Sequence, residues 1–348
     1  MNSNIYLYGA GNIGKRIYDI YKKRGIEIVA FLDANIKNSA IDNKKILDPF
    51  ACLVDTKDST VIVSIFNRDV DFLALKNKLY EVGFDEVLSF FDIYKDISNE
   101  FGDWYWLSSD TDFLSDENVR FVINILSDNI SHDTFAETVK ARKENTYPYV
   151  SNKYPIEEQY VSKDLPLRKY DNFIDVGAYD GDTLVAMDKI NFDIPNIYAF
   201  EPDVRIFQRL ADTVRKLNKK AILFPNGVYS NNEIATFAAD GGEGGCIVND
   251  NAIQYNTIQN VALDDVFINN LKGITLLKMD IEGAEMEALK GAKNLITNSN
   301  MDLAICVYHK PNDIIEIPKY INKLGNFNFY LRQYGFYGID LVLFAFRK

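Results

Sequence analysis

The sequence is poor in histidine and cysteine, and each scarcity excludes a class of site. Only two histidines occur, so a metal centre built from several imidazoles is excluded. The cysteines are odd in number and far apart, which fits neither a disulfide framework nor the spacing of a zinc site. We therefore expect a cytoplasmic protein in a reducing setting. These residues are His132, His309, Cys52, Cys246 and Cys306.

Long apolar runs and an excess of positive charge are also missing. No stretch approaches the roughly 20 apolar residues that a membrane-spanning helix needs. The chain begins directly with a strand pattern, so we expect no signal peptide. The net charge of -12 repels phosphate backbones and disfavours nucleic acid as a partner. What is present, 348 residues with 47% hydrophobic content, suffices for two domains and a sizeable core.

Strands that alternate with helices predict an α/β fold with parallel sheets in two parts of the chain. We expect a small Rossmann-like domain over residues 1–97, a helical connector over 98–170, and a larger Rossmann-like domain over 171–348. The expected strands are residues 5–8, 27–32, 60–64, 86–88, 173–176, 197–200, 221–224, 236–238, 274–279 and 302–308, with 327–333 and 340–346 as a final antiparallel pair. The expected helices include residues 71–82, 116–126, 132–143, 183–190, 204–217, 284–295 and 311–324.

A first glycine-rich turn, GAGNIG, lies between a strand and a helix near the start of the chain. Its glycines, Gly9, Gly11 and Gly14, allow backbone to approach phosphate closely, and the helix N-terminus attracts an anion. Asp33 ends the next strand, where an acid that binds ribose would lie. The pattern favours a nucleotide or nucleotide-sugar site. The alternative is a Rossmann-like domain whose glycines serve only to pack helix against sheet.

A second glycine turn, in FIDVGAYDGDT, carries an acid within its strand. The carboxylate of Asp175 repels a diphosphate but suits a ligand with a cationic amine and sulfonium. Glu201 ends the next strand, where it can bind both hydroxyls of a ribose. Together these acids predict S-adenosyl-L-methionine as cofactor and a methyltransferase as the class of enzyme. The expected cofactor residues are Asp175, Gly177, Tyr179, Gly181, Thr183, Glu201 and Asp203, with Tyr160 as a lid over the cofactor.

The second half of the chain resembles the FkbM family of methyltransferases, because five pieces occur in the family's order. The resemblance implies a Rossmann-like class I methyltransferase that usually O-methylates sugars or other hydroxylated metabolites. It thus implies a sugar or sugar-nucleotide acceptor, as in polysaccharide or glycan biosynthesis. The first domain resembles the small nucleotide-sugar-binding domain of sugar acetyltransferases. The five pieces are DVGAYDGDT, AFEPD, ALDD, LKMDIEGAEMEALKGA and VYHKPNDIIEIPKYI.

Two residues are expected to act on the methyl acceptor. Asp280 ends a strand beside the Gly177 turn, so it should lie near the methyl group. His309 follows the next strand, and the ordinary pKa range of histidine suits a general base whose tautomer a neighbouring acid would fix. The residues expected around the acceptor are Lys278, Glu282, Glu285 and Lys310, with the lysines positioning an anionic acceptor and Glu285 stabilising a helix start.

Several alternatives stay open. We assign no metal, although Asp280, Glu282 and His309 as a mixed oxygen and nitrogen site form the main mechanistic rival. An NAD(P)-dependent oxidoreductase or epimerase that uses GAGNIG is the second functional hypothesis, and a non-catalytic interaction protein is the third. The first domain would hold a nucleotide part of the acceptor, hold a regulatory nucleotide, or mediate assembly into a homo-oligomer. The glycine-rich loop at residues 238–246 is either a cover over the site or a turn tip.

Overall fold

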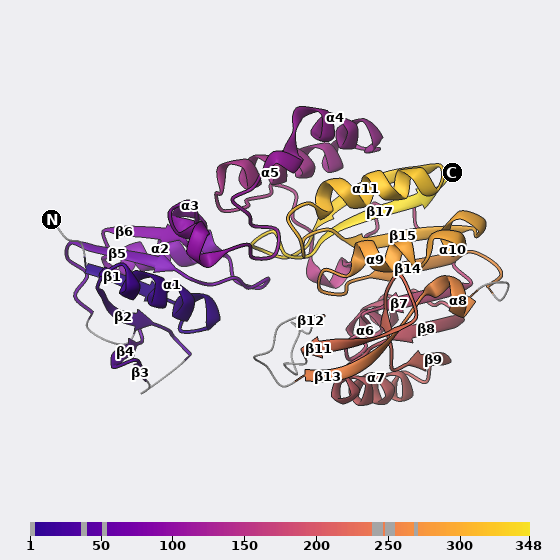
Figure 1. Cartoon of the computed structure of the whole chain (residues 1–348), viewed down its shortest axis with the longest axis horizontal. Helices are drawn as coiled ribbons and strands as arrows, with labels where there is room; N and C mark the ends of the chain where they lie inside the picture. Colours follow the sequence, from indigo (N-terminus) through magenta and orange to yellow (C-terminus); the bar gives the residue numbers. More distant parts are fainter. Residues whose placement is uncertain (1–3, 36–39, 51–53, 239–245, 248–254, 268–270) are drawn as a thin grey trace. The chain divides into compact units, whose positions relative to one another are not determined.

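The computed structural model describes residues 4–35, 40–50, 54–238, 246–247, 255–267 and 271–348 (Figure 1). The glycine-rich loop at residues 238–246 lies almost wholly outside them. The chain divides into two compact units, each built from separate stretches of sequence. Unit 1 comprises Met1–Asp112, Ala136–Ser151 and Gly335–Ile339, and unit 2 comprises Phe113–Phe135, Asn152–Tyr334 and Asp340–Lys348. The stretch predicted as a connector, residues 98–170, is thus divided between both units.

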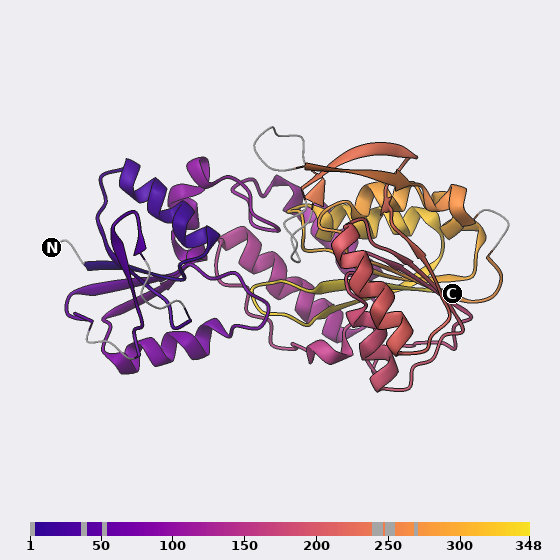
Figure 2. The ribbon, with the colours of Figure 1, turned by 90° about the horizontal axis from the view of Figure 1, so that it is seen from below.

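Unit 1 contains a six-stranded sheet in the order β3-β4-β2-β1-β5-β6. Its strands are β1 (Asn4–Tyr8), β2 (Ile28–Leu32), β3 (Ala40–Ile41), β4 (Lys44–Leu47), β5 (Ser59–Val63) and β6 (Glu86–Ser89). β1 pairs in parallel with β2 and β5, and β5 consists of apolar and small residues that are all buried, as befits a central parallel strand. Helix α1 (Asn12–Lys23) and helix α2 (Phe72–Val82) cover opposite faces of this sheet (Figure 2).

Unit 2 is organised around a seven-stranded sheet in the order β16-β17-β15-β14-β7-β8-β9. The strands are β7 (Asn172–Val176), β8 (Asn196–Phe200), β9 (Ala221–Phe224), β14 (Thr275–Met279), β15 (Met301–Cys306), β16 (Phe327–Gln333) and β17 (Leu341–Arg347). The five strands from β15 to β9 run parallel, while β16 and β17 form the predicted antiparallel pair. The carboxyl ends of β7, β8, β14 and β15 therefore meet at one edge of the sheet.

Helices and a second, smaller sheet complete unit 2. The small sheet has the order β10-β13-β11-β12, with β10 (Gly227–Val228), β11 (Glu233–Ala238), β12 (Cys246–Ile247) and β13 (Tyr255–Val261). The helices of unit 2, with α5 shared between the units, are α4 (Asp116–Ile125), α5 (Asn129–Glu144), α6 (Asp182–Lys189), α7 (Val204–Lys216), α8 (Leu263–Phe267), α9 (Glu285–Lys290), α10 (Lys293–Asn298) and α11 (Asp313–Leu324). No helix among the described residues is long and apolar enough to span a bilayer.

The single helix predicted over residues 284–295 is wrong, because the chain forms two short helices there, α9 and α10. Gly291 separates them, and a Cβ atom at this position would lie 2.1 Å from the carbonyl oxygen of Tyr229. A side chain at residue 291 would therefore prevent the close packing of this corner. The sequence interpretation also missed β13 and the amphipathic helix α3 (Phe90–Phe101), which begins with a capping box formed by Ser89 and Asp92.

A buried arginine fixes the segments of unit 2 that precede its large sheet. The side chain of Arg332, on β16, is fully buried and forms ion pairs with Asp128 at 2.6 Å and Asp164 at 2.8 Å. Ser131 accepts a further hydrogen bond from the same guanidinium at 3.0 Å. These contacts hold the chain around residue 160 close to the sheet edge, where Tyr160 takes part in the site described next.

Candidate functional site

The turn after β7 is built around a buried ion pair. Asp175 and Lys278 are direct partners in the register of β7 and β14, and Lys278 Nζ lies 2.9 Å from Asp175 Oδ1. The same ammonium donates a hydrogen bond of 2.5 Å to the carbonyl oxygen of Gly177. Gly177 has a φ of 77°, and an added Cβ would lie 1.9 Å from the carbonyl oxygen of Asp280. Only glycine fits here, because the turns after β7 and β14 contact each other through their backbones.

The electrostatics of this pair explain why both groups remain in the core. Burial raises the pKa of Asp175 to about 6, against the stabilising influence of Lys278. Burial opposes the charge on Lys278 as well, but Asp175 and Asp280 outweigh it and hold the pKa of the amine above its ordinary value. Lys278 therefore supplies an internal positive charge, and its contacts favour a role in fixing the turn rather than in holding an anionic acceptor.

Glu201 follows β8 directly and is held against the turn after β7. Its Oε2 accepts a hydrogen bond from the backbone N–H of Tyr179 at 3.1 Å, and its Oε1 accepts one from the N–H of Asp203 at 2.8 Å. Burial raises the pKa of Glu201 to about 7. Each oxygen keeps a second lone pair, so the fixed carboxylate can accept two further hydrogen bonds from a diol.

The other predicted cofactor residues divide between the turn and the helices that follow. Tyr179 has a left-handed backbone, with φ 47°, and the guanidinium carbon of Arg209 lies 5.3 Å from the centroid of its ring. Gly181 also has a positive φ and precedes α6, on which Thr183 is buried. Asp203 caps helix α7 by accepting a hydrogen bond from the N–H of Arg205, so its carboxylate is engaged in local structure.

Asp280 follows β14 directly and is surrounded by hydroxyl groups. Tyr160, which the sequence interpretation expected as a lid, is buried and donates a hydrogen bond of 2.8 Å to Asp280 Oδ2. Tyr308 donates a longer one, 3.4 Å, to Oδ1. Although burial opposes the charge, His309 and Lys278 lower the pKa of Asp280, so its carboxylate is ionised near neutral pH. Its side chain keeps 23% of its surface exposed and can reach a ligand.

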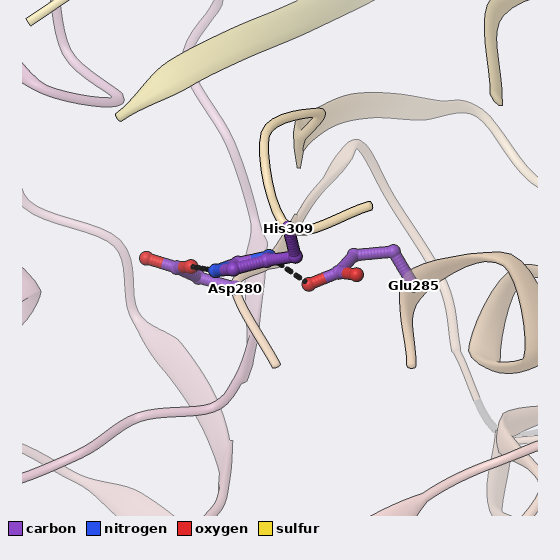
Figure 3. A group of neighbouring side chains, drawn as sticks. All are labelled: Asp280, Glu285 and His309. Carbon is purple, nitrogen blue, oxygen red and sulfur yellow. Dashed lines mark ion pairs between the residues drawn. The ribbon is translucent and has the colours of Figure 1, made fainter. Parts of the chain in front are cut away.

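His309 lies three residues beyond β15, between carboxylates on both sides of its ring (Figure 3). Its Nδ1 is 2.8 Å from Oε1 of Glu285, a fully buried residue at the start of α9. Its Nε2 is 3.4 Å from Oδ1 of Asp280 and 3.8 Å from Oε2 of Glu282. The structure thus brings four predicted residues, one histidine and three acids, to one point at the edge of the sheet.

These carboxylates change what the histidine can do. Burial alone lowers the pKa of His309, but Glu285, Glu282 and Asp280 together raise it to about 10. The imidazole is therefore protonated near neutral pH in this arrangement and donates hydrogen bonds. A protonated imidazole cannot accept a proton, so the general-base role that the sequence suggested requires that a ligand first neutralise some of the surrounding charge.

Three residues of this cluster were not predicted. Tyr308 and Cys306 contact Asp280 and Tyr160 respectively, and both belong to the same strand end as His309. Asp313 accepts a hydrogen bond from the backbone N–H of Lys310, and burial followed by the charge of Glu285 raises its pKa to about 7. The sequence offered one signal for these residues: they lie within or next to the piece VYHKPND, which directly follows β15. Residues that follow one strand lie at the same edge of the sheet. The side chain of Lys310 lies beside Gly283.

The first glycine turn, in unit 1, is tightly packed. A Cβ at Gly14 would lie 2.0 Å from the carbonyl oxygen of Gly9, so this glycine brings helix α1 against the turn. Gly11 precedes α1 without a side-chain cap, and Asp33 Oδ2 accepts a hydrogen bond from the N–H of Ala10 at 3.2 Å. The structure therefore brings all four predicted residues together, with the acid bonded to a backbone amide of the turn.

The sheet order of unit 2, with acids at the carboxyl ends of β7, β8 and β14, defines a Rossmann-like methyltransferase fold. Residues 175–336 match the model of the methyltransferase FkbM domain, and residues 4–70 match that of the PglD N-terminal domain. The chain therefore contains a methyltransferase FkbM domain, which is preceded by a PglD-type domain. This confirms the family and the fold class that the sequence indicated. No curated protein matches the sequence significantly.

One solved structure of high structural similarity supports the same fold. The crystal structure of a methyltransferase FkbM from Methylobacillus flagellatus KT aligns with 99% of this chain and 90% of its own, with a TM-score of 0.71 and 18% identity. An rRNA methylase from Streptococcus thermophilus aligns with 52% of this chain and 90% of its own, at TM-score 0.33 and 13% identity. A putative methyltransferase from Streptococcus mutans, in complex with SAH, aligns with 51% of this chain and 90% of its own, at TM-score 0.31 and 14% identity. The first of these three structures shows that this chain shares its fold.

Proposed function

We propose that the chain transfers a methyl group from S-adenosyl-L-methionine to a hydroxyl of a sugar or sugar nucleotide. The observation that carries this proposal is the carboxylate of Glu201, fixed by two backbone amides beside the turn after β7. A fixed carboxylate at this place in an α/β sheet suits the two hydroxyls of a ribose. Asp175, paired with Lys278, gives the neighbouring turn its shape.

The acceptor would approach from the side of Asp280. In the reaction the acceptor oxygen attacks the methyl carbon, a C–O bond forms, and the S–C bond breaks with its electron pair left on the sulfur. The sulfonium thereby becomes a neutral thioether, and the protonated ether releases the former hydroxyl proton. Asp280, held by Tyr160, is the ionised carboxylate that can take this proton, because the protonated ether is far more acidic than the free hydroxyl. Alignment of the two substrates supplies the rest of the acceleration.

The role proposed for unit 1 is to hold the nucleotide part of the acceptor. Its support is the match to the PglD N-terminal domain together with the three glycines and Asp33 at one turn. The anion-attracting start of helix α1 lies directly after this turn. A regulatory nucleotide at the same turn is the alternative, and it would bind without being methylated.

Calorimetric titration with S-adenosylhomocysteine tests the donor site. We expect wild-type protein to bind it and Glu201→Gln to bind it at least tenfold more weakly, because the substitution replaces one of two acceptor oxygens with a donor. Asp212→Asn is the matched control, since it removes one negative charge from the exposed surface of α7, and its affinity should equal that of wild type.

Product analysis tests the acceptor class. Incubation with donor and a panel of sugars and sugar nucleotides, followed by mass spectrometry, should reveal a gain of one methyl group on one class. Binding of a nicotinamide cofactor with no affinity for S-adenosylhomocysteine would instead establish the oxidoreductase or epimerase hypothesis. Donor binding without any methylated product across the panel would support a non-catalytic interaction protein.

A further inference from the structure

Tyr160 connects the segment that precedes β7 to the end of β14 through its hydroxyl group. We propose that Tyr160 is a positioning residue for methyl transfer: it holds Oδ2 of Asp280 and thereby makes Oδ1 the atom that takes the proton. Gln159 and Asp340 in turn fix the direction of the tyrosine hydroxyl. This role differs from that of a lid over the cofactor, which the sequence suggests. It rests on the proposed methyl transfer, because it assigns the proton acceptor of that reaction.

The hydroxyl of Tyr160 is a permanent hydrogen-bond donor to Asp280. The carboxylate of Asp280 is ionised near neutral pH and has no proton to donate, so the bond of 2.8 Å to Oδ2 runs from the tyrosine to the acid. Burial and the charge of Asp280 raise the pKa of Tyr160 well above its ordinary value. The hydroxyl therefore keeps its proton, and Tyr160 cannot itself act as the base.

A buried amide holds the tyrosine oxygen from another side. Nε2 of Gln159 donates a hydrogen bond of 3.1 Å to the hydroxyl oxygen of Tyr160 and one of 3.3 Å to Oδ1 of Asp340, and all three side chains are buried. Sγ of Cys306 lies 3.4 Å from the same hydroxyl oxygen. An oxygen that accepts a hydrogen bond from the amide has its own proton directed elsewhere, here toward the carboxylate. A continuous chain of hydrogen bonds thus links Asp340 to Asp280.

The backbone and the ring of Tyr160 are fixed as well. Its φ of 69° is left-handed, which is rare for a bulky residue and persists only where the surrounding structure holds it. The ammonium of Lys278 lies 5.5 Å from the centroid of the ring, within the range of a cation–π contact. The same ammonium donates a hydrogen bond to the carbonyl oxygen of Gly177. Lys278 therefore connects the ring of Tyr160 to the turn after β7.

The hydrogen bond at Oδ2 leaves Oδ1 as the reactive oxygen of Asp280. Two contacts of Oδ1 within the protein are longer, 3.4 Å to the hydroxyl of Tyr308 and 3.4 Å to Nε2 of His309. When the C–O bond forms and the S–C bond breaks, the former hydroxyl proton passes from the acceptor oxygen to Oδ1, and Asp280 becomes a neutral acid. The tyrosine proton at Oδ2 prevents that oxygen from competing for the transferred proton.

Other titratable groups also act on Asp280, and the effect of Tyr160 has to be separated from theirs. Burial raises the pKa of Asp280, whereas His309, Lys278 and then Tyr160 lower it. The groups around this carboxylate are Lys278, Asp175, Cys306, Tyr308 and His309, with Glu282 and Glu285 in contact with the histidine. The substitution Tyr160→Phe leaves all of these groups in place, since it removes a single hydroxyl.

Titration of Asp280 tests the proposal without any substrate. Carbon-13 NMR of protein labelled at the aspartate carboxyl carbons follows Asp280, whose signal is assigned by its loss in Asp280→Asn. We expect Asp280 in Tyr160→Phe to take up its proton at a pH about one unit higher than in wild type, because a hydrogen bond to the charged form is lost. Gln159→Met should raise this pKa by less, and it should add nothing to Tyr160→Phe, because Gln159 acts through the hydroxyl.

Tyr170→Phe is the matched control. The buried hydroxyl of Tyr170 donates a hydrogen bond of 2.9 Å to Oδ2 of Asp302, near the amino end of β15. The control thus loses a bond of the same kind, and the pKa of Asp280 should remain that of wild type. Tyr160→Phe keeps its aromatic ring, so it should bind S-adenosylhomocysteine as wild type does. Circular dichroism and this affinity show that the variant folds.

The outcomes separate this proposal from the proposed function. If Asp280 titrates identically in wild type and Tyr160→Phe, or if Tyr170→Phe shifts its pKa equally, the positioning role is wrong, whatever the enzyme methylates. A shift confined to Tyr160→Phe and Gln159→Met supports the role even when no acceptor is methylated. With an acceptor from the product screen, kcat of Tyr160→Phe should fall at least about tenfold at an unchanged KM for the donor. An unchanged kcat would exclude Tyr160 from the reaction.

Discussion

The buried charge of Lys278 changes what its neighbour Asp175 can contribute to a ligand site. Its ammonium contacts the carboxylate of Asp175 and the carbonyl oxygen of Gly177, and its side chain is almost fully buried. The ammonium of Lys278 therefore already compensates the negative charge of Asp175. Asp175 would contribute to the binding of a cationic ligand by fixing the shape of the turn after β7. Removing either partner alone would leave an uncompensated charge in the core, which typically costs about 3–5 kcal/mol. Glu201 is the acid that keeps acceptor capacity for a ligand.

Glu201 should make the stability of the protein depend on pH. Its pKa rises from 4.5 in the unfolded chain to about 7 in the folded one, because burial disfavours the charged form. The folded state thus binds the proton more tightly, and this contribution is present below pH 4.5 and lost as the pH rises through about 7. We predict that the unfolding free energy of Glu201→Gln, relative to wild type, increases by up to about 3 kcal/mol between pH 4.5 and 8.

Urea unfolding of both proteins at several pH values measures this difference. The unfolding free energies of the two proteins should also differ by a constant amount, because the variant loses backbone hydrogen bonds to Glu201. This constant difference does not affect the test. A difference that stays flat over this pH range would show that Glu201 titrates normally, and that its carboxylate is hydrated in the folded protein. Asp212→Asn serves again as the control for the loss of one negative charge from the surface.

At the scale of elements, the turns after β7 and β14 depend on each other. A Cβ at Gly177 would lie 1.9 Å from the carbonyl oxygen of Asp280, whereas the nearest atom to a Cβ at Gly283 would be Cε of the flexible Lys310 side chain, at 3.1 Å. Both glycines have positive φ values, 77° and 95°. We predict that Gly283→Ala costs about 1–2 kcal/mol, from the left-handed backbone alone. Gly177→Ala should lower the unfolding free energy by at least about 2 kcal/mol more than Gly283→Ala does, because the backbones of the two turns must move apart.

Thermal or chemical unfolding of the two variants provides the comparison within one unit. Similar losses for both would mean that the two turns have room to move apart, contrary to the packing described above. The affinity for S-adenosylhomocysteine should fall in Gly177→Ala even below its unfolding temperature, since the displaced turn carries the N–H of Tyr179 that holds Glu201.

Elements with strong apolar patterns were predictable, and those defined by contacts were not. The strands that carry Asp175, Glu201 and Asp280 are buried apolar runs, so their ends could be located from sequence. Because parallel strands share an edge, the proximity of Asp280 and His309 also followed. The roles of Lys278 and Glu285 did not follow, since each depends on which atom its charged group meets. Likewise, β13 has a polar, weakly alternating sequence and was missed.

At the scale of the whole molecule, the methyltransferase unit is larger than the stretch that matches its family model. Residues 113–135 and 152–170 precede that stretch but belong to unit 2. They supply Asp128 and Asp164 to the buried Arg332, and Tyr160 to Asp280. A boundary placed at residue 171, as the strand pattern suggested, would remove all of these contacts.

Two deletions test this larger boundary. We predict that a chain lacking residues 1–112 retains more structure in unit 2 than one lacking residues 1–170, because the shorter chain leaves Arg332 buried without its two acids. That loss typically costs about 3–5 kcal/mol. Expression, circular dichroism and S-adenosylhomocysteine binding should rank the longer chain above the shorter one. Equal behaviour of the two would show that the preceding segments are dispensable. In full-length protein, Asp128→Asn with Asp164→Asn should reproduce part of the defect.

Unit 1 takes in residues 335–339, the connection between β16 and β17, as well as residues 136–151 and the start of the chain. A domain that occupies one continuous stretch at the end of a chain can be replaced by a single genetic crossover. Here three separate stretches would have to be replaced together. Units 1 and 2 should therefore be inherited together. A change in acceptor preference should arise by point substitutions within the two units rather than by exchange of one whole unit.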